Sequence, residues 1–563
     1  MKFSDYPYQR PDLNTVQDNL NTLTSKLEAA INYEEALKTV ESYFKTIDAI
    51  DTQMQLVFIR HSMDTSNKFY NDEQAFVDKT LPLIESFTVR FTNSLLKSPF
   101  KERLEKRFGK LLFEKARLSQ KTFDDKIISD LQLENKYTTE YIKLRSSAKI
   151  PFDNQIFTLA QIAPYTTHQD QKVRMHASKA VSKWFKDNEQ AFDTIYDNLV
   201  KTRHEIATKL GYDNFIELAY DRLRRVDYDA KDVAGYRKQI LEKIVPYVNN
   251  LMMRRKKRLG LKKLMSYDLG LNFLSGNPTP KGDRKWQVEQ AIKMYDALSP
   301  ETSKFFRFMV DKELMDLDSR ANKEGGGYCT YIPDHQSPFI FANFNGTSGD
   351  VDVLTHEAGH AFQVYMSKNL IPEYRWPGYE AAEIHSMSME FLAWPYIHYF
   401  FKEDTDKYKF SHLSSGLEFL PYGALVDHFQ HEVYANPKMT PKMRKATWKK
   451  LESMYQPWKV YDKKDPVSEG LFWYRQGHIF QDPFYYIDYT LAQVLAFDFW
   501  KHNQKDPKTT WQRYLSLCKM GGQYSFVKLL NQAKLPNPFK EGTVEKILDP
   551  VKIYLDNIDD TNF

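Results

Sequence analysis

The chain has 563 residues, of which 42% are apolar and 27% charged, a balance typical of globular proteins that excludes extended disorder and collagen-like repeats. Its 79 Lys and Arg residues against 74 Asp and Glu residues give a net charge of +5, which argues against a nucleic-acid-binding protein. Glycine is scarce, with 21 residues, and this scarcity favours long helices over a turn-rich all-β fold.

Two further features concern the cellular compartment. The opening residues, Met1 to Pro7, lack the apolar core of a signal peptide, and no apolar run reaches the length of a membrane span. The two cysteines, Cys329 and Cys518, belong to no CxxC pair, so neither a disulfide framework nor a thiolate zinc cluster is expected. We therefore predict a cytoplasmic protein without a membrane partner.

Residues 12–320 show a helical pattern almost throughout. Leu37, Val40, Phe44 and Ile47, for example, recur at spacings that place them on one face of a helix. No Gly/Ser-rich linker or low-complexity segment interrupts this region. We therefore expect helical layers that pack into one body.

Almost the only strong strand signals lie near residue 335. β-branched and aromatic residues at 328–332 and 339–344 flank a turn with two prolines, a pattern that predicts a β-hairpin. A helix follows, for which Ser348 or Asp350 can provide the cap, and no proline interrupts it before Pro372. Beyond this point the chain is again predicted to be mainly helical.

Residues 356–360 of that helix, His-Glu-Ala-Gly-His, match the HExxH pattern. On a helix, His356 and His360 lie one turn apart and can bind one metal ion, while Glu357 points toward the open position of the metal. Gly359 has no side chain and would let another backbone approach closely. Asp352, one turn before His356, is expected to accept a hydrogen bond from the imidazole of His356.

A catalytic zinc usually takes three protein ligands, so a third ligand must come from elsewhere. The metzincin pattern is excluded because Gln363 and Met366 occupy its glycine and histidine positions. A second helix, predicted after Pro377 and Gly378, offers several candidate ligands. They are Glu380, Glu383, His385 and Glu390. Spacing alone does not choose among them.

The two motifs together resemble the thimet oligopeptidase family, and in particular its bacterial oligoendopeptidase F branch. The resemblance rests on residues 356–360 followed by residues 383–390, Glu-Ile-His-Ser-Met-Ser-Met-Glu. It implies one Zn²⁺ per chain with Glu383 as the third ligand, and Glu390 supporting the ligands. Glu383 follows His360 by slightly fewer positions than in thimet-type members, so Glu380 and His385 stay open as alternatives.

A later aromatic segment extends the resemblance. Residues 473–478 and 483–489 are similar to the family's late segment with a histidine and tyrosines, whose side chains face the zinc and contact the substrate carbonyl. The resemblance places these roles on His478, Tyr486 and Tyr489. Without it, the aromatic run would indicate a packed core helix.

The resemblance implies a mainly α fold, in which a large helical body with a small β-hairpin or sheet lies beside the HExxH helix and two halves enclose a deep channel. We assign residues 1–199 to an N-terminal helical region that forms part of the channel wall, and residues 200–563 to the zinc metallopeptidase catalytic region. In related enzymes a substrate strand pairs with a sheet edge above the metal helix, and residues 339–344 are the candidate edge.

The implied function is a zinc-dependent oligoendopeptidase that hydrolyses internal bonds of short unstructured peptides. Zinc lowers the pKa of its water, Glu357 accepts the proton, and Tyr486, Tyr489 or His478 donates a hydrogen bond to the oxyanion. No nucleic-acid partner is expected, and the oligomeric state is not predicted.

Two other functions compete with this interpretation. The first is a zinc carboxypeptidase or dipeptidyl carboxypeptidase of similar helical fold, which needs a cationic group for the terminal carboxylate of its substrate, and the sequence does not place one. The second is a non-catalytic helical scaffold in which the HExxH pattern is accidental or has decayed.

Overall fold

The computed structural model describes every residue of the chain except the side chain of Asn562. The fold is mainly helical, with five short strands in two small sheets, so the predicted fold class is confirmed. In the described part of the chain, no helix combines the length and the apolar character that crossing a membrane requires.

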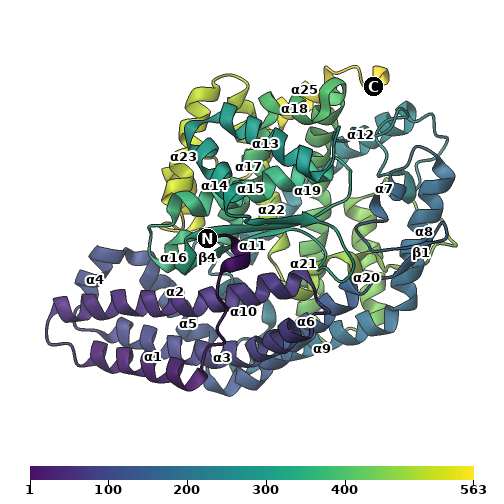
Figure 1. The fold of residues 1–563 in the computed structure, drawn as a ribbon. Coiled ribbons are helices and arrows are strands. Elements are labelled where there is room, and N and C mark those ends of the chain that lie inside the picture. Colours follow the sequence, from purple (N-terminus) through teal and green to yellow (C-terminus); the bar gives the residue numbers. More distant parts are fainter.

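The N-terminal helices form a layered bundle that extends away from the rest of the molecule (lower left in Figure 1). Asp12, Asn32 and Asn67 each cap a helix, because their side chains accept a hydrogen bond from a backbone N–H of the first turn. The bundle has its own hydrophobic cluster, to which Tyr374 contributes from a distant part of the chain. Its helices are α1 (Leu13–Glu28), α2 (Tyr33–Met63), α3 (Lys68–Lys97), α4 (Lys101–Phe108) and α5 (Lys110–Thr122).

The middle of the chain adds a second run of helices around a larger hydrophobic core. Helix α9 (Glu189–Lys209) continues through residue 200 without a break, and the division of the chain at that position stays a prediction. The other helices here are α6 (Ile128–Ser146), α7 (Ala163–Thr166), α8 (Gln171–Asp187), α10 (Phe215–Arg222), α11 (Ala230–Gln239), α12 (Val245–Arg258), α13 (Arg284–Leu298) and α14 (Pro300–Asp311).

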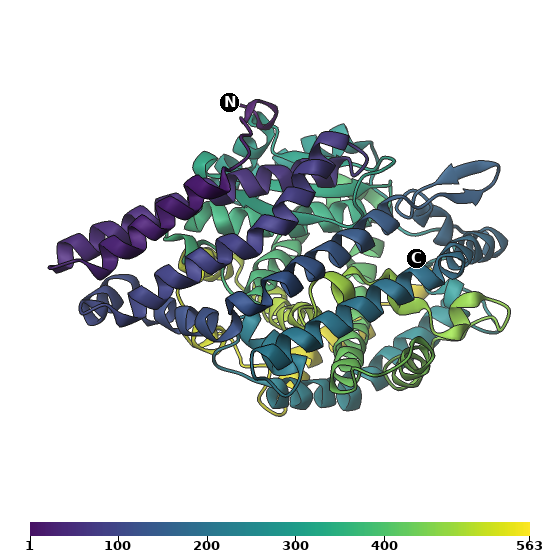
Figure 2. The ribbon, with the colours of Figure 1, turned by 90° about the horizontal axis from the view of Figure 1, so that it is seen from below.

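A hairpin that the sequence analysis did not predict follows α6. Strands β1 (Ile150–Phe152) and β2 (Gln155–Phe157) pair antiparallel and project from the body, as Figure 2 shows. The linking residues, Asp153 and Asn154, both have positive φ, as a two-residue turn of this kind requires. With only three residues in each strand, the alternation of apolar residues is too short to predict a strand.

The larger sheet lies beside the HExxH helix and has the order β3-β5-β4. Strand β5 (Ser337–Phe344) pairs antiparallel with β4 (Tyr328–Ile332), so the predicted hairpin is confirmed. Strand β3 (Met315–Asp318) pairs parallel with the other side of β5. The expectation that residues 339–344 form the sheet edge is therefore wrong, because β5 is central and β3 and β4 are the two edge strands.

Behind this sheet, long helices from the last third of the chain pack on one another (Figure 1). Helix α15 (Gly349–Ser367) contacts both β5 and α17 (Tyr379–Leu392), and α17 packs along α22 (Tyr486–Asn503). The remaining helices are α16 (Pro372–Arg375), α18 (His398–Phe401), α19 (Thr405–Ala435), α20 (Pro441–Tyr455), α21 (Gly477–Gln481), α23 (Pro507–Met520), α24 (Phe526–Gln532) and α25 (Thr543–Asp556).

Candidate metal centre

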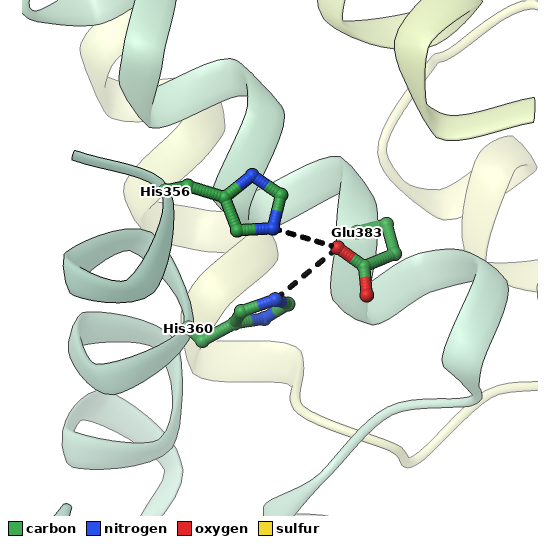
Figure 3. A group of neighbouring side chains, drawn as sticks. All are labelled: His356, His360 and Glu383. Atoms are coloured by element: carbon green, nitrogen blue, oxygen red, sulfur yellow. Dashed lines mark ion pairs between the residues drawn. The ribbon is translucent and has the colours of Figure 1, made fainter. Parts of the chain in front are cut away.

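Three side chains from two helices converge on one point. The Nε2 atoms of His356 and His360 on α15 lie 3.1 Å and 3.2 Å from Oε2 of Glu383 on α17 (Figure 3). Among the residues that the structure describes, no other set of three or more His, Cys, Asp or Glu side chains brings its ligand atoms close enough together to hold a metal ion. The structure therefore brings together the three residues that the sequence analysis named as metal ligands.

The convergence depends on a close backbone approach at Gly359. A Cβ atom added there would lie 2.6 Å from the Cα atom of Ser386 and 2.7 Å from the carbonyl oxygen of His385. Both distances are far below ordinary van der Waals contact, so only glycine allows α15 and α17 to approach this closely. The expectation drawn from Gly359 is confirmed.

The hydrogen bonds of His356 indicate that a cation fits this site. Its Nδ1 lies 2.8 Å from Oε1 of Glu390, and because a carboxylate only accepts, the Nδ1 proton donates to Glu390. A neutral His356 then points its Nε2 lone pair at Oε2 of Glu383, which is also an acceptor. Two imidazole nitrogens and one carboxylate oxygen are a ligand set that zinc takes in catalytic sites.

The charges of the site support the same conclusion. Burial by itself lowers the pKa of His356, but hydrogen bonds to Glu383 and Glu390 raise it well above its usual value. Burial raises the pKa of Glu383, but His360 and His356 bring it well below its usual value. The pocket therefore favours a positive charge facing the Glu383 carboxylate, and either a proton on His356 or a bound cation can supply it.

A chain of hydrogen bonds continues behind His356. The other oxygen of Glu390 lies 2.7 Å from Nε2 of His412, whose Nδ1 lies 3.0 Å from the indole nitrogen of Trp394. Because an indole N–H only donates, His412 accepts at Nδ1 and donates its Nε2 proton to Glu390. This chain fixes the orientation of Glu390 and, through it, the ring of His356.

The expectation for Asp352 is wrong. Its carboxylate accepts a hydrogen bond of 2.6 Å from the hydroxyl of Tyr408, and Glu390 occupies the position on His356 that was expected for Asp352. Asp352 lies one turn away on the same helix, but the approach of α17 places a different carboxylate against the ring.

The two alternative ligands lie elsewhere. Nδ1 of His385 is bonded to the carbonyl oxygen of Ala381, 2.7 Å away, within its own helix. Glu380 lines the cavity described below but is not part of the metal-binding group. Glu383 is held in place from both sides, since Tyr485 donates to Oε1 and the Ser386 hydroxyl donates to Oε2 over 2.9 Å.

Glu357 lies beside the three ligands and faces the same cavity. Its Oε2 atom is buried and forms no hydrogen bond with any group that the structure describes. Burial raises the pKa of Glu357, a shift that favours proton uptake by this carboxylate. The backbone at Gly327 approaches it closely, since a Cβ atom there would lie 3.3 Å from Oε1 of Glu357.

The late histidine and one predicted tyrosine line the same cavity as the metal centre. His478 accepts at Nδ1 from the Gln476 amide over 2.9 Å, so it presents Nε2–H to the Tyr489 hydroxyl, 3.1 Å away. Burial lowers the pKa of His478, in keeping with a neutral ring. The Tyr489 oxygen therefore accepts from His478 and keeps its own proton for another acceptor.

The tyrosines divide differently from the expected pattern. Tyr485 and Tyr489 line the cavity, whereas Tyr486 is not among the lining residues, and its ring packs against Phe419 and Tyr422. The sequence analysis did not name Tyr485 as a residue of the site. Its i, i+4 spacing from Tyr489 places both tyrosines on one face of a helix and could have indicated that they line the same cavity.

The cavity has a volume of about 1020 Å³ and opens between the N-terminal helices and the metal centre. Its walls include Gln55, Phe58 and Lys115 from the N-terminal bundle and residues 325–330, which contain the start of edge strand β4. Residues of the N-terminal bundle and of the later part of the chain thus line one cavity together with the metal centre.

Comparisons with known proteins agree with this geometry. The sequence model of a peptidase M3 N-terminal domain matches residues 3–123, and that of peptidase family M3 matches residues 165–548. An oligoendopeptidase F homolog of Borreliella burgdorferi is 24% identical over 424 residues, which cover 73% of this chain and 68% of the relative.

Solved structures are also similar over the whole chain, among them the following two. One is PZ peptidase A with an inhibitor, at 48% identity and a TM-score of 0.99, with all of both chains covered. The other is a chain assigned as an oligoendopeptidase F from Bacillus anthracis str. Ames, at 46% identity and a TM-score of 0.94, which covers 100% of this chain and 99% of that one.

Proposed function

The chain belongs to peptidase family M3 and is a metallo-endopeptidase, and we propose that it is a zinc-dependent oligoendopeptidase acting on internal bonds of short unstructured peptides. The observation that carries this proposal is the convergence of His356, His360 and Glu383 beside an unpaired buried carboxylate, Glu357. A site with ligands but no neighbouring base would fit a structural metal equally well.

His356, His360 and Glu383 would hold the metal, and a zinc ion bound there supplies a Lewis acid that polarises a water molecule and the scissile carbonyl. Glu357 takes the proton from the attacking water and delivers it to the leaving amine. Because its Oε2 has no competing hydrogen bond, Glu357 is free to exchange this proton.

Tyr489 and His478 are assigned to the oxyanion. The His478–Tyr489 hydrogen bond orients the tyrosine hydroxyl and leaves its proton for the oxyanion that forms during hydrolysis. One donor of this kind typically contributes roughly 3 kcal/mol to transition-state stabilisation. Tyr485 holds the ligand Glu383 in position, and Tyr486 belongs to the packing behind the cavity.

Edge strand β4 is the element proposed to bind the substrate backbone. Its free edge faces the cavity at residues 328–330, where an extended peptide can add main-chain hydrogen bonds as a further strand. Binding of this kind tolerates many side chains. The enclosed cavity admits an extended chain, whereas a folded domain must first unfold locally. A related chain, PZ peptidase A, was solved with an inhibitor bound.

The test is the digestion of a mixed pool of short peptides, blocked at both ends, with products mapped by mass spectrometry with and without a chelator. We expect cleavage at internal bonds that stops when the metal is removed and returns with Zn²⁺. Glu357→Gln should retain zinc and lose nearly all turnover, because the amide cannot accept the proton. The matched control is Glu34→Gln, an exposed position on α2.

Two results would contradict the proposal. Activity of Glu357→Gln within a few-fold of wild type would remove Glu357 as the base. A requirement for a free C-terminal carboxylate in every substrate would identify a carboxypeptidase.

A further inference from the structure

Buried arginines in this protein are paired almost as a rule. Six arginine residues are almost fully buried, and each forms an ion pair with an Asp or Glu carboxylate. Such pairing is expected, because an unpaired charge in a low-dielectric interior is costly. The six are Arg174, Arg203, Arg225, Arg237, Arg255 and Arg444.

Arg145 and Arg475 depart from this rule. Both are half-buried, and neither forms an ion pair with a side chain that the structure describes. The Nε atom of each is buried without a hydrogen-bond partner. The one hydrogen bond that Arg145 donates from its side chain goes to the Tyr141 hydroxyl over a long 3.4 Å. The guanidinium of Arg475 lies over the ring of Phe472, 4.3 Å from its centroid.

The two arginines lie where two cavities meet. Arg145, Arg475 and Gln476 line both the 1020 Å³ cavity of the metal centre and a second cavity of about 610 Å³. Arg145 is also close to the catalytic machinery, since a Cβ atom added at Gly477, the neighbour of His478, would lie 3.5 Å from one of its terminal nitrogens.

Neighbouring carboxylates act on the two arginines only at a distance, and none of those that the structure describes forms an ion pair with either. Burial raises the pKa of Glu324 and Arg145 lowers it, and Oε2 of Glu324 accepts a hydrogen bond from the Ser62 hydroxyl over 2.7 Å. On the side of the second cavity, Lys459 is paired with Glu452 over 2.8 Å and contributes no net charge. Asp465 interacts with Arg475 electrostatically, but its Oδ1 accepts the backbone N–H of Val467 within its own turn and it makes no ion pair with the arginine. Both arginines therefore line the two cavities without a carboxylate bound to their guanidinium groups.

We propose that Arg145 and Arg475 form a subsite that binds a carboxylate of the peptide substrate, a few residues away from the cleaved bond. The inference rests on the proposed peptidase function. Two planar guanidinium groups match the oxygens of a carboxylate and give short, charge-assisted hydrogen bonds. The position follows from Gly477, the chain neighbour of His478, because Arg145 lies against Gly477 and the subsite is therefore next to the segment assigned to the oxyanion.

The carboxylate has two sources, an acidic side chain or the C-terminus of the peptide. A side chain would let the peptide continue into the second cavity, whereas a terminal carboxylate would end it at the arginines. The sequence provided no cationic group for a terminal carboxylate, and the fold assembles one from α6 and from the segment before α21.

The experiment uses the zinc-loaded full-length enzyme and one cleavable peptide that is blocked at both ends. In the first set of substrates, each position around the cleaved bond carries Gln or Glu in turn. In the second set, the C-terminal amide is replaced by a free carboxylate at several distances from that bond. The measured quantity is the ratio of kcat/KM for the carboxylate peptide to kcat/KM for its neutral counterpart.

We expect this ratio of kcat/KM values to reach about ten or more at one position in one of the two sets. Most of the difference should lie in KM, because the neutral peptide lacks the charged, bidentate hydrogen bond to the arginines. Arg145→Gln and Arg475→Gln should each bring this ratio to below about two. Arg145→Lys, which keeps the charge without the planar fork, should retain part of it. The control Arg307→Gln, at an exposed arginine paired with Asp296, should keep the full ratio.

Several results would overturn the subsite. They are a ratio near one at every position in the wild-type enzyme, an unchanged ratio in both glutamine variants, or an equal loss of activity on neutral and acidic peptides. If the wild-type enzyme cleaved none of the peptides, the proposed function would fail instead. Fluorescence anisotropy of a labelled carboxylate peptide and its amide, with wild type and Arg145→Gln, would then still decide on the subsite.

Discussion

Gly359→Ala is the smallest change that should damage the metal centre without touching any ligand. The substitution adds one methyl group at the point where α15 and α17 are in backbone contact. The new Cβ atom would lie 2.6 Å from the Cα atom of Ser386, 2.7 Å from the carbonyl oxygen of His385 and 3.0 Å from Cβ of Met389. Two of these three atoms are backbone, so no rotation of a side chain relieves the contact.

The size of the effect follows from these distances. Carbon atoms in contact prefer separations of about 3.5–4.0 Å, so the helices must separate by about 1 Å. Overpacking of this kind costs about 1–3 kcal/mol of stability. Glu383 lies one turn before Ser386 on α17 and would move with it, away from both histidines. Because metal sites tolerate about 0.2 Å in their ligand distances, we expect zinc affinity to fall by about 10- to 100-fold.

The assay compares Gly359→Ala with Gly235→Ala, a matched change in α11. Gly235 is exposed, has a helical neighbourhood and no atom within 4 Å of an added Cβ. There the substitution should stabilise by up to about 1 kcal/mol, as expected from helix propensity. Zinc affinity is measured by competition with a chelating dye, and melting temperature is measured with and without chelator. Gly359→Ala should lower both quantities, and Gly235→Ala should lower neither.

The reasoning would be refuted if Gly359→Ala bound zinc within threefold of wild type and melted at the same temperature in chelator. Such a result would mean that the two helices can separate at no cost and that the close approach does not position Glu383.

Three further predictions test other parts of the protein. Glu383→Ala should lower zinc affinity by more than about 100-fold, since substitutions of residues that only support the ligands typically cost about 10- to 100-fold, and Glu380→Ala should leave the affinity unchanged. Equal zinc affinities of the two variants in a dye-competition assay would show that Glu383 is not a ligand. Tyr489→Phe should lower kcat by about 100-fold, and Tyr486→Phe should lower it by no more than a few-fold. If steady-state kinetics showed that Tyr489→Phe changes only KM, the assignment of Tyr489 to the oxyanion would be wrong. Glu134→Gln should cost about 3 kcal/mol at pH 7, because burial raises the pKa of this carboxyl but two arginines lower it to about 2. Glu134 makes its full contribution to the free energy of unfolding above about pH 4.5 and loses it as the pH falls toward 2. The difference in the free energy of urea unfolding between wild type and variant should therefore shrink below about pH 4.5, and a difference that grows there would contradict the prediction.

Local features of the centre could be derived from the sequence because they depend on one helix at a time. His356 and His360 share a face at i, i+4 spacing in any α-helix, and Glu357 must project beside them. A glycine in the middle of that helix is unfavourable by about 1 kcal/mol, so its presence at position 359 indicated a close contact before the partner was known. The antiparallel pairing of residues 328–344 followed in the same way from two adjacent apolar segments and the turn between them.

Contacts between distant elements were decided by the tertiary structure. On α17, Glu380, Glu383 and Glu390 are all carboxylates on one short helix, and the rotation of that helix against α15 decides which of them meets the histidines. The same packing places Glu390, and not Asp352, against the ring of His356. Strand β3 is too short for its pattern to be recognised, yet its pairing makes β5 central and leaves β3 and β4 at the two edges.

The sequence by itself therefore determined the family resemblance, the helical fold class and the two histidines with their base. The tertiary structure decided which carboxylate meets the two histidines, which tyrosines line the cavity and which strands lie at the edges of the sheet. It also brought Arg145, from the last turn of α6, next to Gly477, although nothing in either segment indicates the other. The physical reason is that helical and strand periodicities fix the direction of a side chain relative to its own element, whereas the packing of elements on one another depends on the shapes of many side chains together.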